Sequence, residues 1–168
     1  MIDKKQLEAI EVTELFQKSF FENIYVDEGD VSEEKSDDLS LEKAFLDGVT
    51  MNQVEISELS ALDSVFTKSS FAGAVIEQSY LVRLEINSTR LQGIQLTELR
   101  AIDTSFISSK LNDANFRYSK LKNVLFRSCD LTGIDFIGSN LKNVVFEECD
   151  LTQSNSSQTE LTNVSFST

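Results

Sequence analysis

The chain has 168 residues, of which 40% are hydrophobic, and its 28 Asp and Glu outnumber 15 Lys and Arg to give a formal net charge of −13 at pH 7. This acidic balance argues against direct binding to nucleic acid or to anionic membranes, and favours basic protein surfaces as partners. The sequence contains no His, the commonest acid–base group near neutral pH, and its two Cys are too few for a disulfide scaffold.

The N-terminal segment MIDKKQLEAI lacks the apolar core of a signal peptide. No apolar run elsewhere approaches the ~18 residues of a membrane-spanning helix. We therefore expect a cytoplasmic protein.

Residues 1–40 precede the regular part of the sequence and are expected to cap it. Between Asp3 and Phe21 the pattern fits a short amphipathic helix with Leu7 and Ile10 on one face. Over residues 12–26 a first, degenerate coil of the later repeat fits equally well. Its evidence is a set of apolar residues five apart: Phe16, Phe21 and Val26.

Residues 27–38, DEGDVSEEKSDD, are dominated by acids and contain one Lys. Such a composition is typical of a solvated, mobile loop, because it offers almost nothing to bury. A docking element for a basic partner is the alternative interpretation.

From Leu41 to Phe166 every fifth residue is apolar, with Ser156 as the one polar exception. We call this position the centre of each repeat. The position two residues earlier holds only Ala, Val, Leu, Ile, Cys, Ser or Thr, and neither position carries a charge. A period of five fits neither a 3.6-residue helix nor a two-residue strand. Both positions are therefore predicted to face inward.

The runs NDANFRYSKL at 112–121 and CDLTGIDFIGSNL at 129–141 resemble the signature of the pentapeptide-repeat family, in which a small residue and Asp or Asn precede Leu or Phe. Many other repeats are degenerate and lack the middle Asp or Asn. The resemblance covers residues 39–168. It implies an all-β fold: a right-handed quadrilateral parallel β-helix with four repeats per coil.

The coil length has independent support, because the sequence is most similar to itself at a spacing of 20. LKNVLFRSCDLTG at 121–133 realigns with LKNVVFEECDLTQ at 141–153 and then with LTNVSF at 161–166. The expected organisation is thus an N-terminal cap and acidic loop at 1–40, followed by a β-helix at 41–168. Six to eight coils are expected in all.

Inward residues should stack on residues 20 positions later. One expected ladder consists of Phe106, Phe126, Phe146 and Phe166. In two repeats a Leu at the minor inward position is followed by an Ala at the centre, which keeps the enclosed volume nearly constant. The two examples are Leu59 with Ala61 and Leu99 with Ala101. Most Gly and several Asn fall two residues after a centre, where a corner with φ > 0 is expected.

No catalytic residue, cofactor or metal is expected. Cys129 and Cys149, 20 residues apart, are predicted to be packed thiols in preference to a disulfide. Asp130 and Asp150 should share an outward column as solvated charges, with a cation site or an acid–base pair as the alternative. A weak surface ion pair is expected between Arg127 and Glu147.

The favoured function is a non-catalytic interaction module with an unidentified protein partner. Its candidate partner-binding residues are Asp130, Asp150, Glu147, Glu148, Arg90, Arg100, Lys110 and Lys120. The family resemblance implies an alternative, since some members resemble DNA in shape and charge and bind type II topoisomerases, DNA gyrase or topoisomerase IV. Residues 83–127 weaken that alternative, because they hold eight Lys and Arg against four Asp and Glu.

The repeat stops at Thr168 in the middle of a coil, with Leu161 and Phe166 still in the inward phase. An open end would expose apolar side chains and strand edges. A homodimer through the C-terminal end, with Leu161 and Phe166 in contact, is therefore expected. The polar run from Gln153 to Glu160 supports the alternative of a solvated end.

Overall fold

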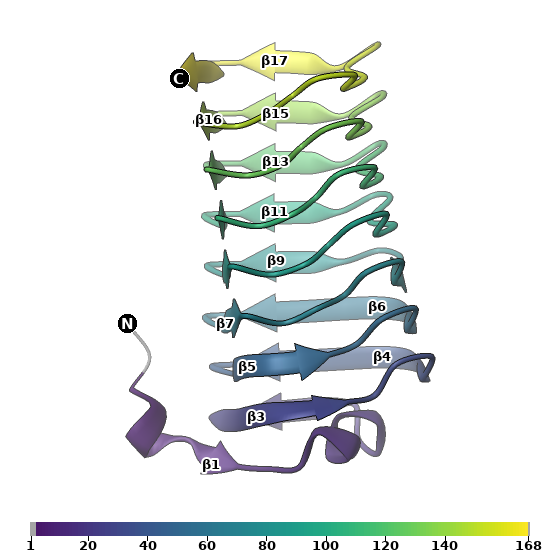
Figure 1. Ribbon diagram of the computed structural model, residues 1–168, viewed down its shortest axis with the longest axis vertical. Coiled ribbons are helices and arrows are strands. Elements are labelled where there is room, and N and C mark those ends of the chain that lie inside the picture. Colours follow the sequence, from purple (N-terminus) through teal and green to yellow (C-terminus); the bar gives the residue numbers. More distant parts are fainter. Residues whose placement is uncertain (1–2, 168) are drawn as a thin grey trace.

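The computed structural model describes residues 3–167, which wind into one parallel β-helix of about eight right-handed turns (Figure 1). The chain enters at one end of the rod and leaves at the other. The predicted fold class is confirmed, because all of the paired strands are parallel and the helical content of residues 3–167 is limited to two short 3₁₀ turns.

One side of the rod, sheet 1, consists of nine parallel strands. In spatial order these are β1 (Glu8–Ala9), β3 (Ile24–Asp30), β5 (Phe45–Thr50), β7 (Val65–Thr67), β10 (Glu85–Asn87), β12 (Ser105–Ile107), β14 (Leu125–Arg127), β16 (Val145–Glu147) and β18 (Ser165–Ser167).

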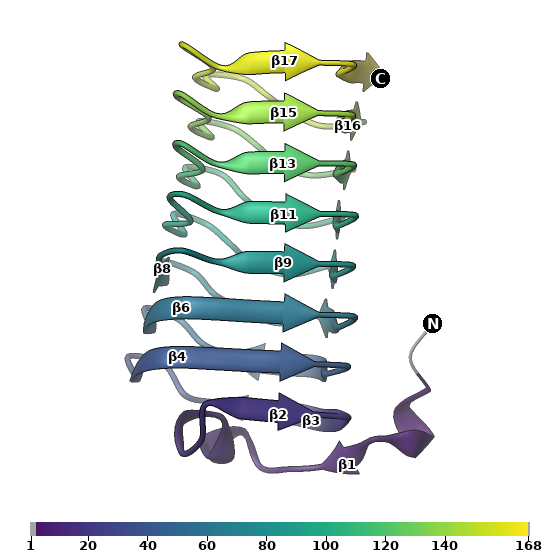
Figure 2. The same ribbon diagram turned by 180° about the vertical axis from the view of Figure 1, so that it is seen from behind.

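A second side, sheet 2, faces the reader in Figure 2. Its strands in spatial order are β2 (Phe20–Glu22), β4 (Lys35–Glu42), β6 (Glu55–Leu62), β9 (Tyr80–Val82), β11 (Arg100–Ile102), β13 (Lys120–Lys122), β15 (Asn140–Lys142) and β17 (Glu160–Thr162), with β8 (Val75–Ile76) also paired to β6. The remaining two sides are joined by isolated parallel bridges, such as Arg90 to Lys110 and Gln95 to Asn115.

Register is the same throughout the regular coils, since each bridged residue pairs with the residue 20 positions later. Phe106 lies beside Phe126, and Phe126 lies beside Phe146. Their ring centroids are 4.8 and 5.1 Å apart and nearly parallel, and Phe166 continues the stack at 5.1 Å. The predicted ladder is confirmed.

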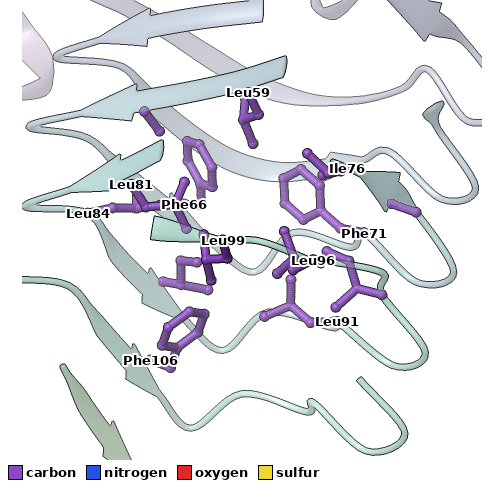
Figure 3. Packing of buried hydrophobic residues seen from close by; sticks show 14 of the residues in the cluster. Leu59, Phe66, Phe71, Ile76, Leu81, Leu84, Leu91, Leu96, Leu99 and Phe106 are labelled. Carbon is purple, nitrogen blue, oxygen red and sulfur yellow. The ribbon is translucent and has the colours of Figure 1, made fainter. Parts of the chain in front are cut away.

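The core is a column of apolar side chains along the rod axis, part of which appears in Figure 3. Every centre from Leu41 to Phe146 is buried, as is every residue two positions before it. Leu99 and Ala101 are both fully buried, so the large and the small side chain do lie in the same layer of the interior. The two inward positions were thus identified correctly.

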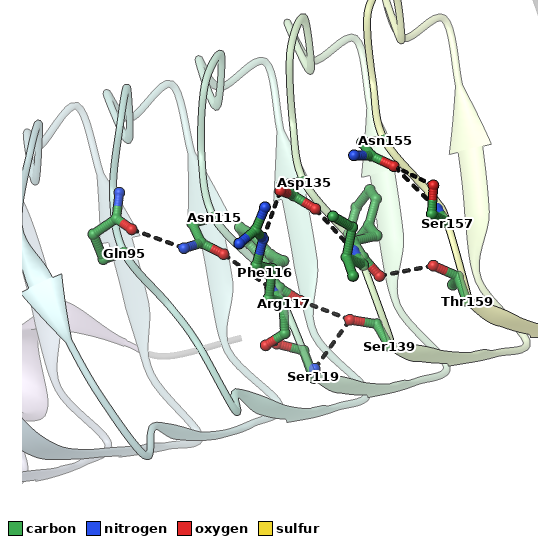
Figure 4. A network of polar contacts seen from close by, with 12 residues as sticks. Gln95, Asn115, Phe116, Arg117, Ser119, Asp135, Ser139, Asn155, Ser157 and Thr159 are labelled. Carbon is green, nitrogen blue, oxygen red and sulfur yellow. Dashed lines mark hydrogen bonds and ion pairs between the residues drawn. The ribbon is translucent and has the colours of Figure 1, made fainter.

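Buried hydroxyl groups at the minor inward position bond to the backbone. Ser139 Oγ donates to the Phe116 carbonyl at 2.7 Å and accepts from the Ser119 N–H at 3.0 Å (Figure 4). One coil further towards the C-terminus, the half-buried Thr159 Oγ1 repeats the first contact and donates to the Phe136 carbonyl at 2.7 Å. Among the described residues, no buried side-chain nitrogen or oxygen lacks a partner. This explains why Ser and Thr are accepted there, since a buried hydroxyl is costly only when it is unpaired.

Corners fall two residues after the centres, as predicted, except after Ile56, where β6 continues through Glu58. Gly and Asn are not required at these corners. From Asp63 to Asn163 every such position has φ > 0, including Arg83, Glu98 and Tyr118. The left-handed conformation costs an ordinary residue roughly 1–2 kcal/mol. Pairing between coils must therefore outweigh this local cost at many corners.

The N-terminal end is closed by two 3₁₀ turns, η1 (Lys4–Gln6) and η2 (Val12–Phe16). The predicted amphipathic helix over residues 3–21 is wrong, and strand β2 already follows the coil path. Leu15 of η2 is fully buried, and Val12 packs so closely on Gly29 (φ +115°) that a Cβ at Gly29 would collide with Val12 Cγ1. The cap is thus a short segment pressed across the first coil.

The predicted acidic loop at 27–38 is also wrong. Strand β3 runs to Asp30 and pairs with β5, while β4 starts at Lys35 and pairs with β6. Only residues 31–34 between them are outside a strand. The coils therefore begin before residue 41. Parallel pairing satisfies this backbone, and every acid in the segment points to solvent.

The C-terminal end has no cap among the described residues. Strands β17 and β18 are paired on one side alone, and all six of their residues are exposed. Leu161 is 54% exposed and Phe166 is 62% exposed, although both keep the inward phase.

Candidate protein-interaction surface

Outward side chains lie in straight columns because consecutive coils are in register. Arg90, Lys110, Asp130 and Asp150 form one such column, each bridged to the next through the backbone. The structure thus brings together four of the predicted site residues. The column changes from basic to acidic towards the C-terminal end.

The two carboxylates of this column are engaged locally. Asp130 Oδ1 accepts from the Thr132 N–H at 3.1 Å, and Asp150 Oδ1 accepts from the Thr152 N–H at 2.9 Å. Hydrogen bonds from Thr152 lower the pKa of Asp150, so this group is ionised at neutral pH. Within residues 3–167, no group of three or more His, Cys, Asp or Glu is arranged to hold a metal ion.

Glu147 and Glu148 lie one coil above their partners. Arg127 Nε donates to Glu147 Oε2, which confirms the predicted ion pair, and Ser128 Oγ donates to Glu148 Oε2 at 2.8 Å. Both contacts are at the surface, where such pairs contribute at most about 1 kcal/mol.

The cations at residues 83–127 divide into two groups. Arg83, Arg117 and Arg127 form ion pairs with acids of neighbouring coils. The other five form no ion pair with any described residue. These are Arg90, Arg100, Lys110, Lys120 and Lys122.

Sheet 2 stacks like charges directly on one another. Arg100 of β11 pairs in register with Lys120 of β13, and Lys122 pairs with Lys142 of β15. Neighbouring strands lie ~4.8 Å apart, so each pair repels its partner across a short distance. No acid lies between the two cations of either pair, and the next acid along the Arg100 row is Glu160 of β17.

A shallow hollow of about 600 Å³ lies beside this row on sheet 2. Its lining consists of Gln78, Ser79, Tyr80, Glu98, Arg100, Tyr118 and Lys120. Tyr80 is 45% exposed and Tyr118 is 60% exposed, which makes them two of the few large apolar side chains on the surface. Arg100 and Lys120 are predicted site residues, whereas the two tyrosines and Glu98 were not predicted from the sequence.

The 20-residue spacing could have revealed them. Tyr80, Arg100 and Lys120 occupy one outward row, and Glu98 and Tyr118 occupy the adjoining corner row. Tyr118 leans over Gly138 of the next coil, where an added Cβ would lie 2.8 Å from its ring. The absence of a side chain at Gly138 therefore provides the space in which the Tyr118 ring lies.

The two cysteines are free. Cys129 is buried, and its Sγ donates to the Phe106 carbonyl at 3.3 Å. Burial raises the pKa of Cys129 to about 11, and burial also raises the pKa of Cys149. Both remain thiols at neutral pH and are poor nucleophiles, in line with the predicted packed thiols.

In the described part of the chain, no helix has the length and apolar character needed to cross a membrane.

A sequence profile described as "Pentapeptide repeat region" matches residues 87–156. Those residues span coils with the five-residue inward phase and the 20-residue register described above. The predicted resemblance is thus confirmed for these residues, which form a pentapeptide repeat region. The comparison with curated protein sequences found no match.

Several solved structures are similar to this chain. A trypsin-treated variant of QnrB1, a plasmid-mediated fluoroquinolone resistance protein, has 15% identity and a TM-score of 0.46, with 82% of this chain and 77% of that chain covered. Rfr23, a pentapeptide-repeat protein from the cyanobacterium Cyanothece, has 13% identity and a TM-score of 0.38, with 73% and 86% covered. HetL, a pentapeptide-repeat protein of the cyanobacterium Nostoc involved in heterocyst differentiation regulation, has 13% identity and a TM-score of 0.28, with 92% and 96% covered.

Proposed function

We propose that the protein is a non-catalytic interaction module of the cytoplasm, whose outward charged columns bind a protein partner. The observation that carries this proposal is the set of like charges stacked in register, Arg90 on Lys110 and Arg100 on Lys120, without an ion pair among the described residues. Stacked like charges destabilise a sheet. Features that oppose stability are commonly kept where they serve binding.

Affinity capture from the source cell tests this proposal. The wild-type protein is the bait, and a variant with Arg90→Gln, Arg100→Gln, Lys110→Gln and Lys120→Gln is its matched comparison. We expect a partner retained by the wild type and lost by the variant, while circular dichroism shows the same β-helix in both. If the wild type retains nothing above background, the proposal is wrong.

The alternative function is modulation of a type II topoisomerase by a protein that imitates DNA. Such a protein would inhibit gyrase or protect it against quinolones. The acidic segment 27–38 favours it, since these residues extend the charged surface of the rod and do not form a loop. The basic residues at 83–127 oppose it, since a duplex is anionic along its whole length.

A supercoiling assay separates the two functions. Micromolar protein should alter the activity of gyrase or topoisomerase IV from the source organism if it imitates DNA, and added salt should weaken the effect. An unchanged supercoiling rate would remove this alternative and leave the interaction module.

We further propose that the C-terminal end forms a two-fold homodimer. Leu161 and Phe166 expose apolar surface worth about 25 cal/mol per Å² if buried, and β17 and β18 have free edges. Sedimentation equilibrium at tens of micromolar should show twice the 18.9 kDa chain mass. Phe166→Asp should return it to monomer with its circular dichroism unchanged, whereas a monomeric wild type would contradict the dimer.

A further inference from the structure

We infer that the hollow on sheet 2 binds an extended acidic segment of a protein partner, held by Arg100 and Lys120 and by the faces of Tyr80 and Tyr118. This inference rests on the proposed interaction function and names the surface and the chemistry of the partner. The surface is defined by its lining, which the 20-residue register assembles from three successive coils.

Charge is the first support. Arg100 and Lys120 are exposed, lie on adjacent strands and form no ion pair with described residues. Lys122 and Lys142 continue the cationic area one row away on the same sheet. A protein with a net charge of −13 thus places together four cations that form no ion pair with any described residue. An anionic group placed between the rows would relieve the repulsion within both pairs.

The size of the area favours a peptide over a nucleic acid. Arg100 and Lys120 span a single step between strands, ~4.8 Å. Glu98 lies within the hollow, and Glu160 lies two strands beyond Lys120 in the same row. A long polyanion would cross these carboxylates, whereas two or three acidic side chains of a peptide would contact the cations alone.

The tyrosines supply the second support. Exposed aromatic rings and Arg are enriched on protein-binding surfaces, and the rings add contact area with little loss of side-chain freedom. Tyr118 sits at a corner with φ +58° and leans over Gly138, so its ring is presented at the rim of the hollow. Its side chain offers an apolar face for a residue adjoining the acidic ones.

The test uses a fluorescein-labelled peptide of alternating Glu and Leu, about ten residues long, and fluorescence anisotropy at low salt with the full chain. We expect saturable binding to the wild type. Arg100→Gln with Lys120→Gln should weaken it about tenfold and reduce its salt dependence. Tyr118→Ser should weaken it about threefold and leave the salt dependence unchanged.

The matched control is Lys35→Gln with Arg127→Gln, which removes the same charge from two ion-paired sites outside the hollow. Its affinity should stay within twofold of the wild type. Equal loss in the control and in the hollow variant would overturn the inference, as would the absence of peptide binding or tighter binding of a single-stranded oligonucleotide. Circular dichroism of each variant excludes unfolding as the cause.

This inference and the proposed function fail differently. If the wild type and the Arg100→Gln, Lys120→Gln variant capture the same cellular partner equally well, the interaction function stands and the hollow is not its site. If neither the peptide nor any cellular protein binds the wild type, both are wrong.

Discussion

At each end of the rod the outermost coil has unpaired strand edges and apolar side chains, and the two ends differ in how far these are covered. At the N-terminal end, η2 lies across the first coil and buries Leu15 completely. At the C-terminal end no described residue covers the outermost coil, and Phe166 is 62% exposed. A β-helix needs only its repeat to grow, whereas ending it requires a segment that departs from the repeat. The N-terminal sequence supplies such a segment, and the described C-terminal residues do not.

The same difference can be followed inside one ladder. Phe126 and Phe166 occupy equivalent positions two coils apart, yet Phe126 is fully buried. Position along the rod, and not the repeat itself, decides how much each ring contributes.

The largest expected effect comes from truncating that ladder. Phe126→Ala should destabilise the protein by about 3–5 kcal/mol, because it leaves a cavity between two stacked rings. Phe166→Ala should cost less than about 1 kcal/mol in the monomer, where its ring is largely in water. Urea unfolding at low micromolar concentration measures both. Equal losses would show that the end is as well packed as the middle.

The cap itself gives the next effect. Leu15→Ala should cost about 2–4 kcal/mol, since Leu15 packs into the first coil, and should speed amide exchange in β2 and β3. Leu161→Ala is the control at the open end and should change stability by less than about 0.5 kcal/mol. If Leu15→Ala lowers stability no more than Leu161→Ala does, the N-terminal segment does not stabilise the first coil as a cap.

Volume exchange in the middle of the rod should produce a smaller effect. Ala101→Leu should cost about 1–3 kcal/mol, because Leu99 already fills that layer. Adding Leu99→Ala should recover part of the loss, as measured by thermal and chemical unfolding of the double variant. If the two substitutions lower the free energy of unfolding additively, the volumes of Leu99 and Ala101 do not compensate for each other.

The smallest effect concerns the ion pair between Lys4 and Asp47, which joins the N-terminal segment to β5. Lys4 Nζ lies 2.6 Å from Asp47 Oδ2 and 4.1 Å from the centre of the Phe45 ring, and the hydrogen bond to Asp47 raises the pKa of Lys4 above 10.5. A raised pKa stabilises the fold below the unfolded-state pKa and ceases to do so as pH rises through the folded value. The exposed pair should contribute less than about 1 kcal/mol.

The measurement is the stability difference between wild type and Lys4→Gln across pH. It should be constant from pH 7 to 9 and fall towards zero above about pH 11. Lys122→Gln, at a site with no ion pair to a described residue, should show no such decline. A Lys4→Gln difference that persists at pH 12 would assign the contribution to contacts of the side-chain stem.

Most of the fold follows from two positions in a five-residue repeat. Uncharged residues at both positions over residues 39–168 predict the inward faces, and the 20-residue similarity predicts the register that places Phe106 on Phe126. These predictions succeed because an inward residue has the same kind of neighbours in every coil, namely the residues 20 positions before and after it. The candidate site was only partly predictable, since Tyr118 and Glu98 look like ordinary variable residues until their neighbours are known.

The N-terminal region shows where sequence stops being informative. An acid-rich stretch such as 27–38 has the composition of a loop, and its local propensity contains no sign that β5 and β6 lie ready to pair with it. The corners give the same lesson, because Arg83 and Tyr118 take left-handed conformations that their own preferences disfavour.

The sequence by itself therefore determined the period, the inward residues, the coil length and the outward columns, because the five-residue repeat places each of these residues in an equivalent position. The tertiary structure alone decided how the first coil forms, which end is closed and which cations lack an ion-pair partner among the described residues. Those outcomes depend on hydrogen bonds and contacts between segments about 20 residues apart, where pairing with an existing strand outweighs the preference of either segment alone.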